Sequence, residues 1–127
     1  MKVCKFMILG TGTDIVEISR LAEALEKIAA RVFTAAELSR AESSAHRLEH
    51  LAGRWAAKEA FAKALGCGFG EKCSWLDIEI TNEPNGKPVM NLRGVTRSSL
   101  EAMGGKKVHL SISHEKSYAT AFVIIEG

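Results

Sequence analysis

The stretch RWAAKEAFAKALG, residues 54–66, closes the longest helical pattern in the chain. Apolar side chains recur at helical spacing on one stripe, formed by Leu48, Leu51, Ala52, Trp55 and Ala62. Gly66 supplies a stop signal after the pattern, so we predict one helix over residues 46–65. Glu59 falls in the middle of the apolar stripe, where a leucine is expected.

Glu59 should therefore face the interior of the protein or a cleft. A buried carboxylate without a partner costs several kcal/mol, roughly, so it needs a cation or a metal ion to stay ionised. Lys63 lies one turn later and can form an ordinary surface ion pair with Glu59. The apolar stripe favours a ligand site over that pair, and both interpretations stay open from the residues alone.

Asp14 is a second carboxylate that could belong to a ligand site. It follows FMILGTGT, a short apolar run with two glycines that predicts a buried strand. We expect Asp14 just beyond the end of that strand, where the glycines allow a close approach to another element. Two carboxylates from separate elements suit Mg²⁺ that also holds phosphate groups. GTGTD is not a dinucleotide fingerprint, because Ile15 replaces the third glycine.

Three further helices are predicted from periodicity and caps. The first runs from Ser19, as its N-cap, to Val32, and the second follows a capping box in TAAE, residues 34–37. A short helix is expected over residues 95–103.

Strand patterns occupy most of the remaining chain. WLDIEIT and VMNL predict a hairpin over residues 75–92, with Asn85 and Gly86 as its tight turn. VHLSISH and YATAFVII, residues 108–114 and 118–125, predict two more strands. The order of the elements indicates an α+β fold, a small and mostly antiparallel sheet packed with helices, in a single domain over residues 1–127.

Composition excludes several classes of function. Seventeen Lys and Arg stand against fifteen Asp and Glu, a net charge of +2, which does not favour nucleic-acid binding. No apolar run is long enough to span a membrane. The three cysteines lack the paired spacing of a zinc or redox motif, so we expect reduced thiols in a cytoplasmic protein.

Histidines occur in two contexts. HRLEH, residues 46–50, fits the H-x-x-E-H pattern of some zinc peptidases. His46 and His50 project away from Leu48, however, so we expect both to be solvated and do not favour a zinc site. His114 ends a strand on which polar residues gather, and this position suits contacts with an anion.

Four motifs together resemble the holo-acyl-carrier-protein synthases, the short bacterial class of 4′-phosphopantetheinyl transferases. They are GTDIVEISR, RWAAKEAFAKALG, NGKP and HLSISHEKSYATAFVI, in the family's order and spacing. The likeness runs from about Ile8 to Glu126, which makes residues 1–6 an expected N-terminal extension. The resemblance implies the family's fold and a homotrimer with interfacial active sites.

The resemblance also implies the reaction. The phosphopantetheine arm of coenzyme A passes to a serine of apo acyl carrier protein, and adenosine 3′,5′-bisphosphate is released. Asp14 and Glu59 match the family residues that bind Mg²⁺ with the pyrophosphate of coenzyme A, and Lys63 matches a lysine at the phosphates. The general base stays open between Glu59 and a metal-bound water oriented by Asp14. A rival function is a non-catalytic module that binds acyl carrier protein or coenzyme A.

Further ligand contacts are implied by the same resemblance. The expected contacts with coenzyme A, including its 3′-phosphate, are Arg54, Gly66, Asn85, Gly86, Lys87, Pro88 and His114. On the helix after Asp14, three basic residues share one stripe, namely Arg20, Lys27 and Arg31. We expect this stripe to dock the acidic carrier protein; the alternative is an ordinary solvated face, since Glu23 and Glu26 lie nearby.

Overall fold

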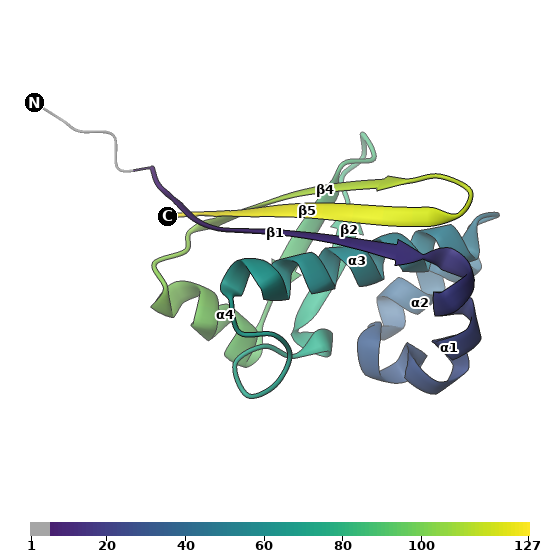
Figure 1. Cartoon of the computed structure of the whole chain (residues 1–127), viewed down its shortest axis with the longest axis horizontal. Helices are drawn as coiled ribbons and strands as arrows, with labels where there is room; N and C mark the ends of the chain where they lie inside the picture. The colour runs from purple at the N-terminus through teal and green to yellow at the C-terminus, as the bar shows by residue number, and fades with distance from the viewer. Residues whose placement is uncertain (1–5) are drawn as a thin grey trace, which may run out of the picture.

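The computed structural model describes residues 6–127, and its α-helices and strands follow the predicted order (Figure 1). The strand predicted from Trp75 begins only at Ile78, because Trp75–Asp77 form a 3₁₀ helix, η1. Most of the expected extension, residues 1–6, lies outside the described residues, as does Cys4. The elements are β1 (Ile8–Glu17), α1 (Ile18–Val32), α2 (Ala35–Glu42), α3 (Arg47–Leu65), η1 (Trp75–Asp77), β2 (Ile78–Asn82), β3 (Pro88–Leu92), α4 (Gly94–Ala102), β4 (Lys107–His114) and β5 (Tyr118–Glu126). Over the described range, no helix combines the length and apolar character needed to cross a membrane.

The strands confirm the α+β prediction. β5 lies in the centre of a three-stranded sheet with order β1-β5-β4, and β2 and β3 form a separate hairpin. All these pairs are antiparallel. Along β5, buried side chains alternate with more exposed ones, so that Ala121 and Val123 enter the core while Phe122 faces outward.

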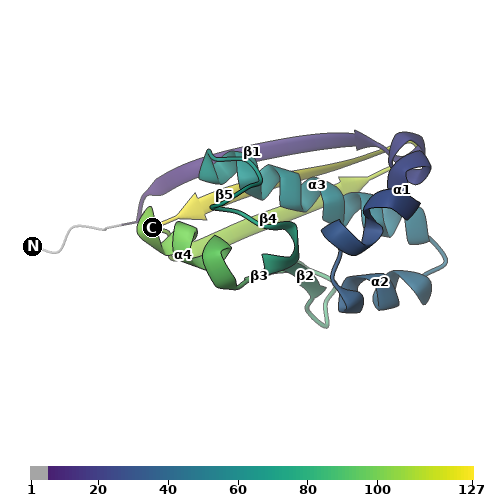
Figure 2. The same ribbon diagram turned by 90° about the horizontal axis from the view of Figure 1, so that it is seen from below.

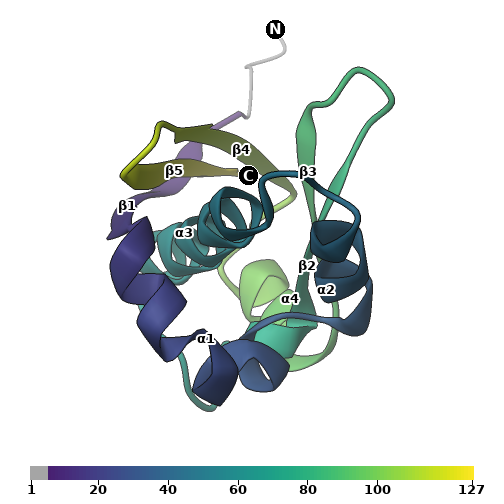
Figure 3. The same cartoon turned by 90° about the vertical axis from the view of Figure 1, so that its right-hand side faces the viewer.

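α3 runs through the middle of the molecule (Figure 3). Seen almost end-on, it has the three-stranded sheet on one side and α1, α2 and the β2–β3 hairpin on the others. α1 and α2 lie toward one end of α3, and α4 lies toward the other (Figure 2). The prediction of a single apolar stripe therefore understates its burial, because alanines on several sides of α3 are also completely buried, including Ala56, Ala57 and Ala60.

The glycines of β1 do not end the strand, which corrects the position expected for Asp14. β1 continues to Glu17, and Asp14 lies within it, opposite Ala121 of β5. A Cβ atom on Gly12 would collide with the backbone of α3 at Ala60, and Gly10 has the same relation to the next turn. These glycines thus let strand and helix pack closely, and pairing with β5 keeps the chain extended.

Two predicted caps have different outcomes. The expected N-cap at Ser19 is wrong, because α1 begins at Ile18, directly after β1, and its N-cap Glu17 makes no side-chain capping bond. The capping box before α2 is confirmed. The backbone amide of Glu37 donates to Thr34 Oγ1 at 3.2 Å, and the amide of Thr34 donates to Glu37 Oε1 at 2.9 Å.

The hairpin turn is one residue out of its predicted place. Its centre is Pro84 and Asn85, because the amide of Gly86 donates to the carbonyl of Glu83 at 2.8 Å. Gly86 follows with φ of 91°, in the left-handed region. Proline favours the first central position of a type I turn, and a glycine bulge then returns the chain to the strand. The sequence pair Asn-Gly signalled a turn correctly but not its centre.

A buried ion pair joins α2 to α3 and was not predicted. Lys58 Nζ donates to Glu37 Oε1 at 2.8 Å, and both side chains are fully buried. The same ammonium donates to the carbonyls of Val32 at 2.6 Å and Trp75 at 3.1 Å. Glu37 Oε2 accepts from the amide of Ile80 at 2.8 Å. One buried pair therefore ties the end of α1, α2, η1 and β2 to the central helix.

Candidate functional site

Asp14, Glu59 and Lys63 come together where β1 crosses α3. Lys63 Nζ donates to Asp14 Oδ1 at 3.0 Å and to the carbonyl of Thr13, also at 3.0 Å. The Asp14 side chain is only 14% exposed, whereas that of Lys63 is 53% exposed and reaches solvent. Lys63 therefore pairs with the carboxylate of β1, and not with Glu59 as the surface-pair interpretation required.

Glu59 is half-buried in this cluster, as its place on the apolar stripe predicted. Burial raises the pKa of its carboxyl above the usual value, Asp14 raises it further, and Lys63 opposes the change. Two carboxylates and one ammonium suit a hard cation or a group that carries negative oxygen atoms. Within residues 6–127, no cluster of three or more His, Cys, Asp or Glu side chains could hold a metal ion. A cation here would take its other oxygen ligands from water or a bound ligand.

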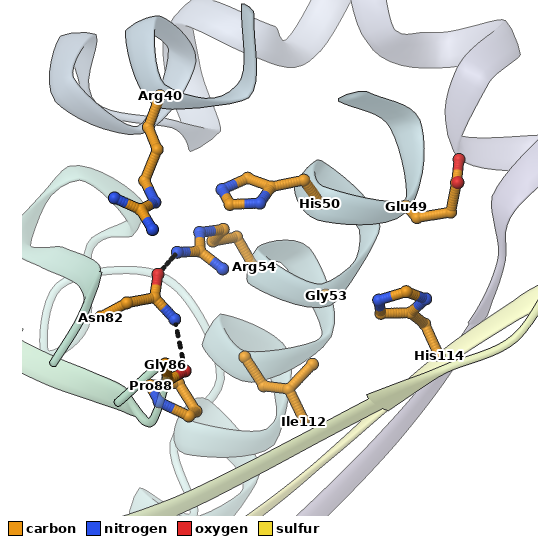
Figure 4. Close-up of a pocket in the computed structure, with 10 residues that line it drawn as sticks. All are labelled: Arg40, Glu49, His50, Gly53, Arg54, Asn82, Gly86, Pro88, Ile112 and His114. Carbon is orange, nitrogen blue, oxygen red and sulfur yellow. Dashed lines mark hydrogen bonds between the residues drawn. The ribbon is translucent and has the colours of Figure 1, made fainter. Parts of the chain in front are cut away.

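A second cluster lines a pocket of about 280 Å³ on another side of α3 (Figure 4). α2, α3, β4 and the β2–β3 hairpin contribute its walls, which are Arg40, Glu49, His50, Gly53, Arg54, Asn82, Gly86, Pro88, Ile112 and His114. The pocket thus unites four of the residues expected to contact coenzyme A: Arg54, Gly86, Pro88 and His114. Asn85 and Lys87 are exposed at the hairpin tip and do not line it.

Arg54 is the best-fixed member of this pocket. It is 5% exposed, and its Nη2 donates to Asn82 Oδ1. Asn82 Nδ2 in turn donates to the carbonyl of Gly86 at 2.9 Å. This chain of hydrogen bonds holds the guanidinium against the hairpin and leaves it at the pocket wall (Figure 4).

His50 corrects another expectation. It is half-buried in the same pocket and not solvated, because α2 and the hairpin cover that side of α3. Burial, and then the charges of Arg54, Arg40 and His114, lower the pKa of its imidazole to about 4. His46, by contrast, is exposed as predicted.

The two clusters do not share one cleft in a single chain. Arg54 and Glu59 are five residues apart on α3, so their side chains point about 140° apart around the helix axis. Gly66 belongs to neither the Arg54 pocket nor the cluster around Asp14. It ends α3 as its C-cap with φ of 82°, which confirms the stop signal, and it lines a different cavity of about 560 Å³ beside Cys67.

Residues 10–123 match the family described as the 4′-phosphopantetheinyl transferase superfamily. A holo-[acyl-carrier-protein] synthase of Koribacter versatilis is 42% identical over 124 residues, which cover 94% of this chain and 99% of that protein. The chain belongs to the 4′-phosphopantetheinyl transferase superfamily. The resemblance seen in the four sequence motifs is therefore confirmed.

Solved structures of this superfamily share the fold. The crystal structure of holo-[acyl-carrier-protein] synthase from Neisseria meningitidis has a TM-score of 0.88 and 38% identity, covering 95% of this chain and all of that chain. A holo-(acyl-carrier-protein) synthase from Bacillus anthracis, solved in complex with CoA (3′,5′-ADP), has a TM-score of 0.81 and 40% identity. That match covers 94% of this chain and 97% of the other.

Sequence reasoning missed six of the ten residues that line the Arg54 pocket, including Arg40, His50 and Asn82. Arg40, His50 and Asn82 reach it from α2, α3 and β2 respectively. His50 carried a signal, since it lies one turn before Arg54 on the same helix. Arg40 and Asn82 carried none, because only the packing of α2 and the hairpin onto α3 brings them to the pocket.

The basic stripe on α1 is exposed. Arg20, Lys27 and Arg31 all reach solvent, as do Glu23 and Glu26 between them. The stripe is therefore accessible to a partner, and its role in docking stays a prediction.

Proposed function

We propose that this member of the superfamily transfers the 4′-phosphopantetheine group of coenzyme A to a serine of apo acyl carrier protein, releasing adenosine 3′,5′-bisphosphate. Its relatives are named for that product, and one was solved with a ligand from coenzyme A. The observation that carries the proposal is the meeting of Asp14, Glu59 and Lys63, which two separate motifs predicted. A module that only binds carrier protein or coenzyme A has no need of two adjoining carboxylates beside an anion site.

The donor set of this cluster fits Mg²⁺. Mg²⁺ in proteins is usually held by one or two carboxylates, with water and substrate phosphates as the remaining ligands. Asp14 and Glu59 would supply the carboxylates. When bound, the ion would neutralise negative charge that develops on the pyrophosphate as the serine oxygen attacks phosphorus.

Lys63 and Glu59 would act on the reacting groups. Lys63 ends in a partly exposed ammonium, so it can hold a phosphate oxygen as a point charge while it stays close to Asp14. Glu59 is a candidate to accept the serine proton, since its carboxylate lies in the same cluster as Asp14 and Lys63. The alternative base is a water oriented by Asp14.

The Arg54 pocket would hold the nucleotide end of coenzyme A. Arg54 and His114 offer cationic and hydrogen-bonding groups for its 3′-phosphate, and Gly86 and Pro88 form the hairpin wall beside them. Asn85 and Lys87, at the exposed hairpin tip, would contact the same ligand from outside the pocket. Gly66, at the C-terminal end of α3, is proposed as a contact farther along the ligand.

We propose a homotrimer in which each active site combines the Arg54 pocket of one subunit with the Asp14 cluster of the next. The two clusters point to different sides of α3, which supports a site completed by another subunit. The outer face of the sheet also supports association, because Ile15 is 65% exposed and Phe122 is 45% exposed on neighbouring strands. Arg20, Lys27 and Arg31 would dock the acidic carrier protein.

The proposal is tested by the fate of coenzyme A. The protein is incubated with coenzyme A and Mg²⁺, with and without apo acyl carrier protein, and adenosine 3′,5′-bisphosphate is measured by chromatography. We expect release only when the carrier is present, in equal amount to the carrier consumed. Tight binding of coenzyme A without any release would instead support the non-catalytic binding module.

A further inference from the structure

Two residues that line the pocket of Figure 4 each carry a buried nitrogen atom without a hydrogen-bond partner among residues 6–127. They are Nε2 of His50 and Nε of Arg54, and the described residues contain no other such side-chain atom. Buried polar atoms are nearly always hydrogen-bonded, because an unmade bond leaves their desolvation uncompensated. Two of them on residues that line one cavity indicate a polar ligand that completes their bonding.

The charges around His50 favour an anion as that ligand. The guanidiniums of Arg40 and Arg54 lie beside its ring, and His114 enters from β4 across the pocket (Figure 4). Asn82, on β2, is neutral and accepts from Arg54. Glu49 is the one acidic side chain on the wall, and its Oε2 lies 3.0 Å from Nδ1 of His46, in an ion pair outside the pocket.

The imidazole of His50 is the group whose charge an anion would change most. Its pKa is lowered to about 4, so near pH 6 only about 1% of the free protein carries a proton there. Burial is the largest cause, followed by repulsion from Arg54, Arg40 and His114. A phosphate dianion would offset the repulsion from these three charges and favour the imidazolium form.

We propose that His50 is a further binding residue for the terminal phosphate of the nucleotide, and that its imidazole takes up a proton from solvent when a phosphate monoester enters the pocket. This inference rests on the proposed function, in which the ligand is coenzyme A. The 3′-phosphate is the only monoester phosphate of that molecule. His50 thereby makes binding of coenzyme A dependent on pH.

The direction of the pH dependence follows from the linkage between proton binding at His50 and binding of coenzyme A. The pKa of His50 is higher in the complex than in the free protein, so its contribution to affinity is complete below the free-protein pKa of about 4 and is lost as pH rises through the raised pKa of the complex. A charge-assisted hydrogen bond of this kind strengthens binding about ten- to a hundredfold. Because this gain raises the pKa of His50 by only about one to two units, affinity for coenzyme A should rise by up to about twofold as pH falls from about 8 to about 6, and further below pH 6.

The test is calorimetry of the full chain with coenzyme A, in buffers of different ionisation enthalpy, which gives the number of protons taken up. His50→Gln keeps a hydrogen-bonding amide near the position of Nε2 but cannot titrate. His46→Gln is the matched control, an exposed histidine one turn away on the same helix. Near pH 6, wild type and His46→Gln should take up more protons than His50→Gln, by up to about half a proton, and only His50→Gln should lose the pH-dependent affinity.

The outcomes separate this inference from the proposed function. Coenzyme A that binds with equal proton uptake in wild type and His50→Gln overturns the role of His50 alone. No binding to wild type counts against both. Dephospho-coenzyme A should show no uptake that depends on His50, and persistent uptake would contradict the phosphate assignment. Should His50→Gln fail to fold, the titration of the His50 ring by NMR decides in wild type, where its pKa must rise on binding.

Discussion

At Glu59, a proton and a divalent cation compete for one carboxylate. Burial and Asp14 raise the pKa of Glu59, so its acid form persists to higher pH than in an ordinary glutamate. At limiting Mg²⁺, kcat/KM should fall as pH drops through this raised pKa, and more Mg²⁺ should move the fall to lower pH. The measurement is kcat/KM against pH at several Mg²⁺ concentrations, with Glu23→Gln on exposed α1 as control. If the fall of kcat/KM at low pH occurs at the same pH for every Mg²⁺ concentration, the proton and the cation do not compete for Glu59.

Residues whose role depends on a tertiary partner were the ones that sequence could not assign. Glu59 was found because a charge interrupts an apolar stripe, a local signal. Lys58, the neighbouring residue, interrupts the same run, yet its partner Glu37 is 21 residues away and only packing brings them together. The prediction that His50 is solvated was wrong for the same reason, since the elements that cover this side chain, α2 and the β2–β3 hairpin, lie elsewhere in the chain.

At the scale of elements, the Lys58–Glu37 pair should control stability. Lys58→Met leaves the carboxylate of Glu37 buried without its cation, which should lower the free energy of unfolding by about 3–5 kcal/mol. Lys27→Met, on the exposed face of α1, is the matched control and should change it by less than about 0.5 kcal/mol. Urea unfolding measures both. If the two variants are equally stable, the buried pair does not hold these elements together.

The crossing of β1 and α3 gives a second prediction at this scale. Gly12→Ala would place a methyl group against the α3 backbone at Ala60, so we expect the free energy of unfolding to fall by about 1–3 kcal/mol. Activity should fall as well, because Asp14 and Lys63 lie at the same crossing. Gly70→Ala is the control, since no atom lies within 4 Å of an added Cβ there. Equal urea midpoints for the two variants would show that β1 can move away from α3 without loss of stability, and would contradict this prediction.

Most elements could be predicted because their signals are local. The span of α3, its stop at Gly66 and the capping box at Thr34 were confirmed, since each depends on residues within a few turns. β1 was predicted too short, because its glycines resemble an ending until α3 is placed against them. The hairpin turn moved by one residue because Pro84 competes with the Asn-Gly pair for the centre.

For the whole molecule, docking of the carrier should depend on the charge of α1. Arg20→Glu combined with Arg31→Glu should raise KM for the carrier protein about tenfold or more and change KM for coenzyme A little, because opposite charges guide association. Raising the salt concentration should shrink the difference, since charges are screened over about 8–10 Å. Steady-state kinetics at low and high salt measure this. Unchanged KM for the carrier at low salt would place the docking surface elsewhere.

The domain boundaries of the protein, its cellular location and the partners it lacks remain predictions from the sequence. The four motifs span the described chain, and family membership covers residues 10–123. A single domain over residues 1–127, a cytoplasmic location, and the absence of nucleic-acid and membrane partners rest on composition and pattern alone. The trimer is a proposal that sedimentation of the purified protein can decide.

The central claim is that Asp14 and Glu59 make this chain a phosphopantetheinyl transferase. The most direct test is the intact mass of apo acyl carrier protein after incubation with coenzyme A, Mg²⁺ and the protein. We predict that wild type adds one phosphopantetheine to the carrier serine, whereas Asp14→Asn and Glu59→Gln, which keep the shape of the side chain but lose its charge, reduce the initial rate at least about a hundredfold while remaining folded. An unmodified carrier with wild type, or a near-normal rate with either variant at limiting Mg²⁺, would contradict the account.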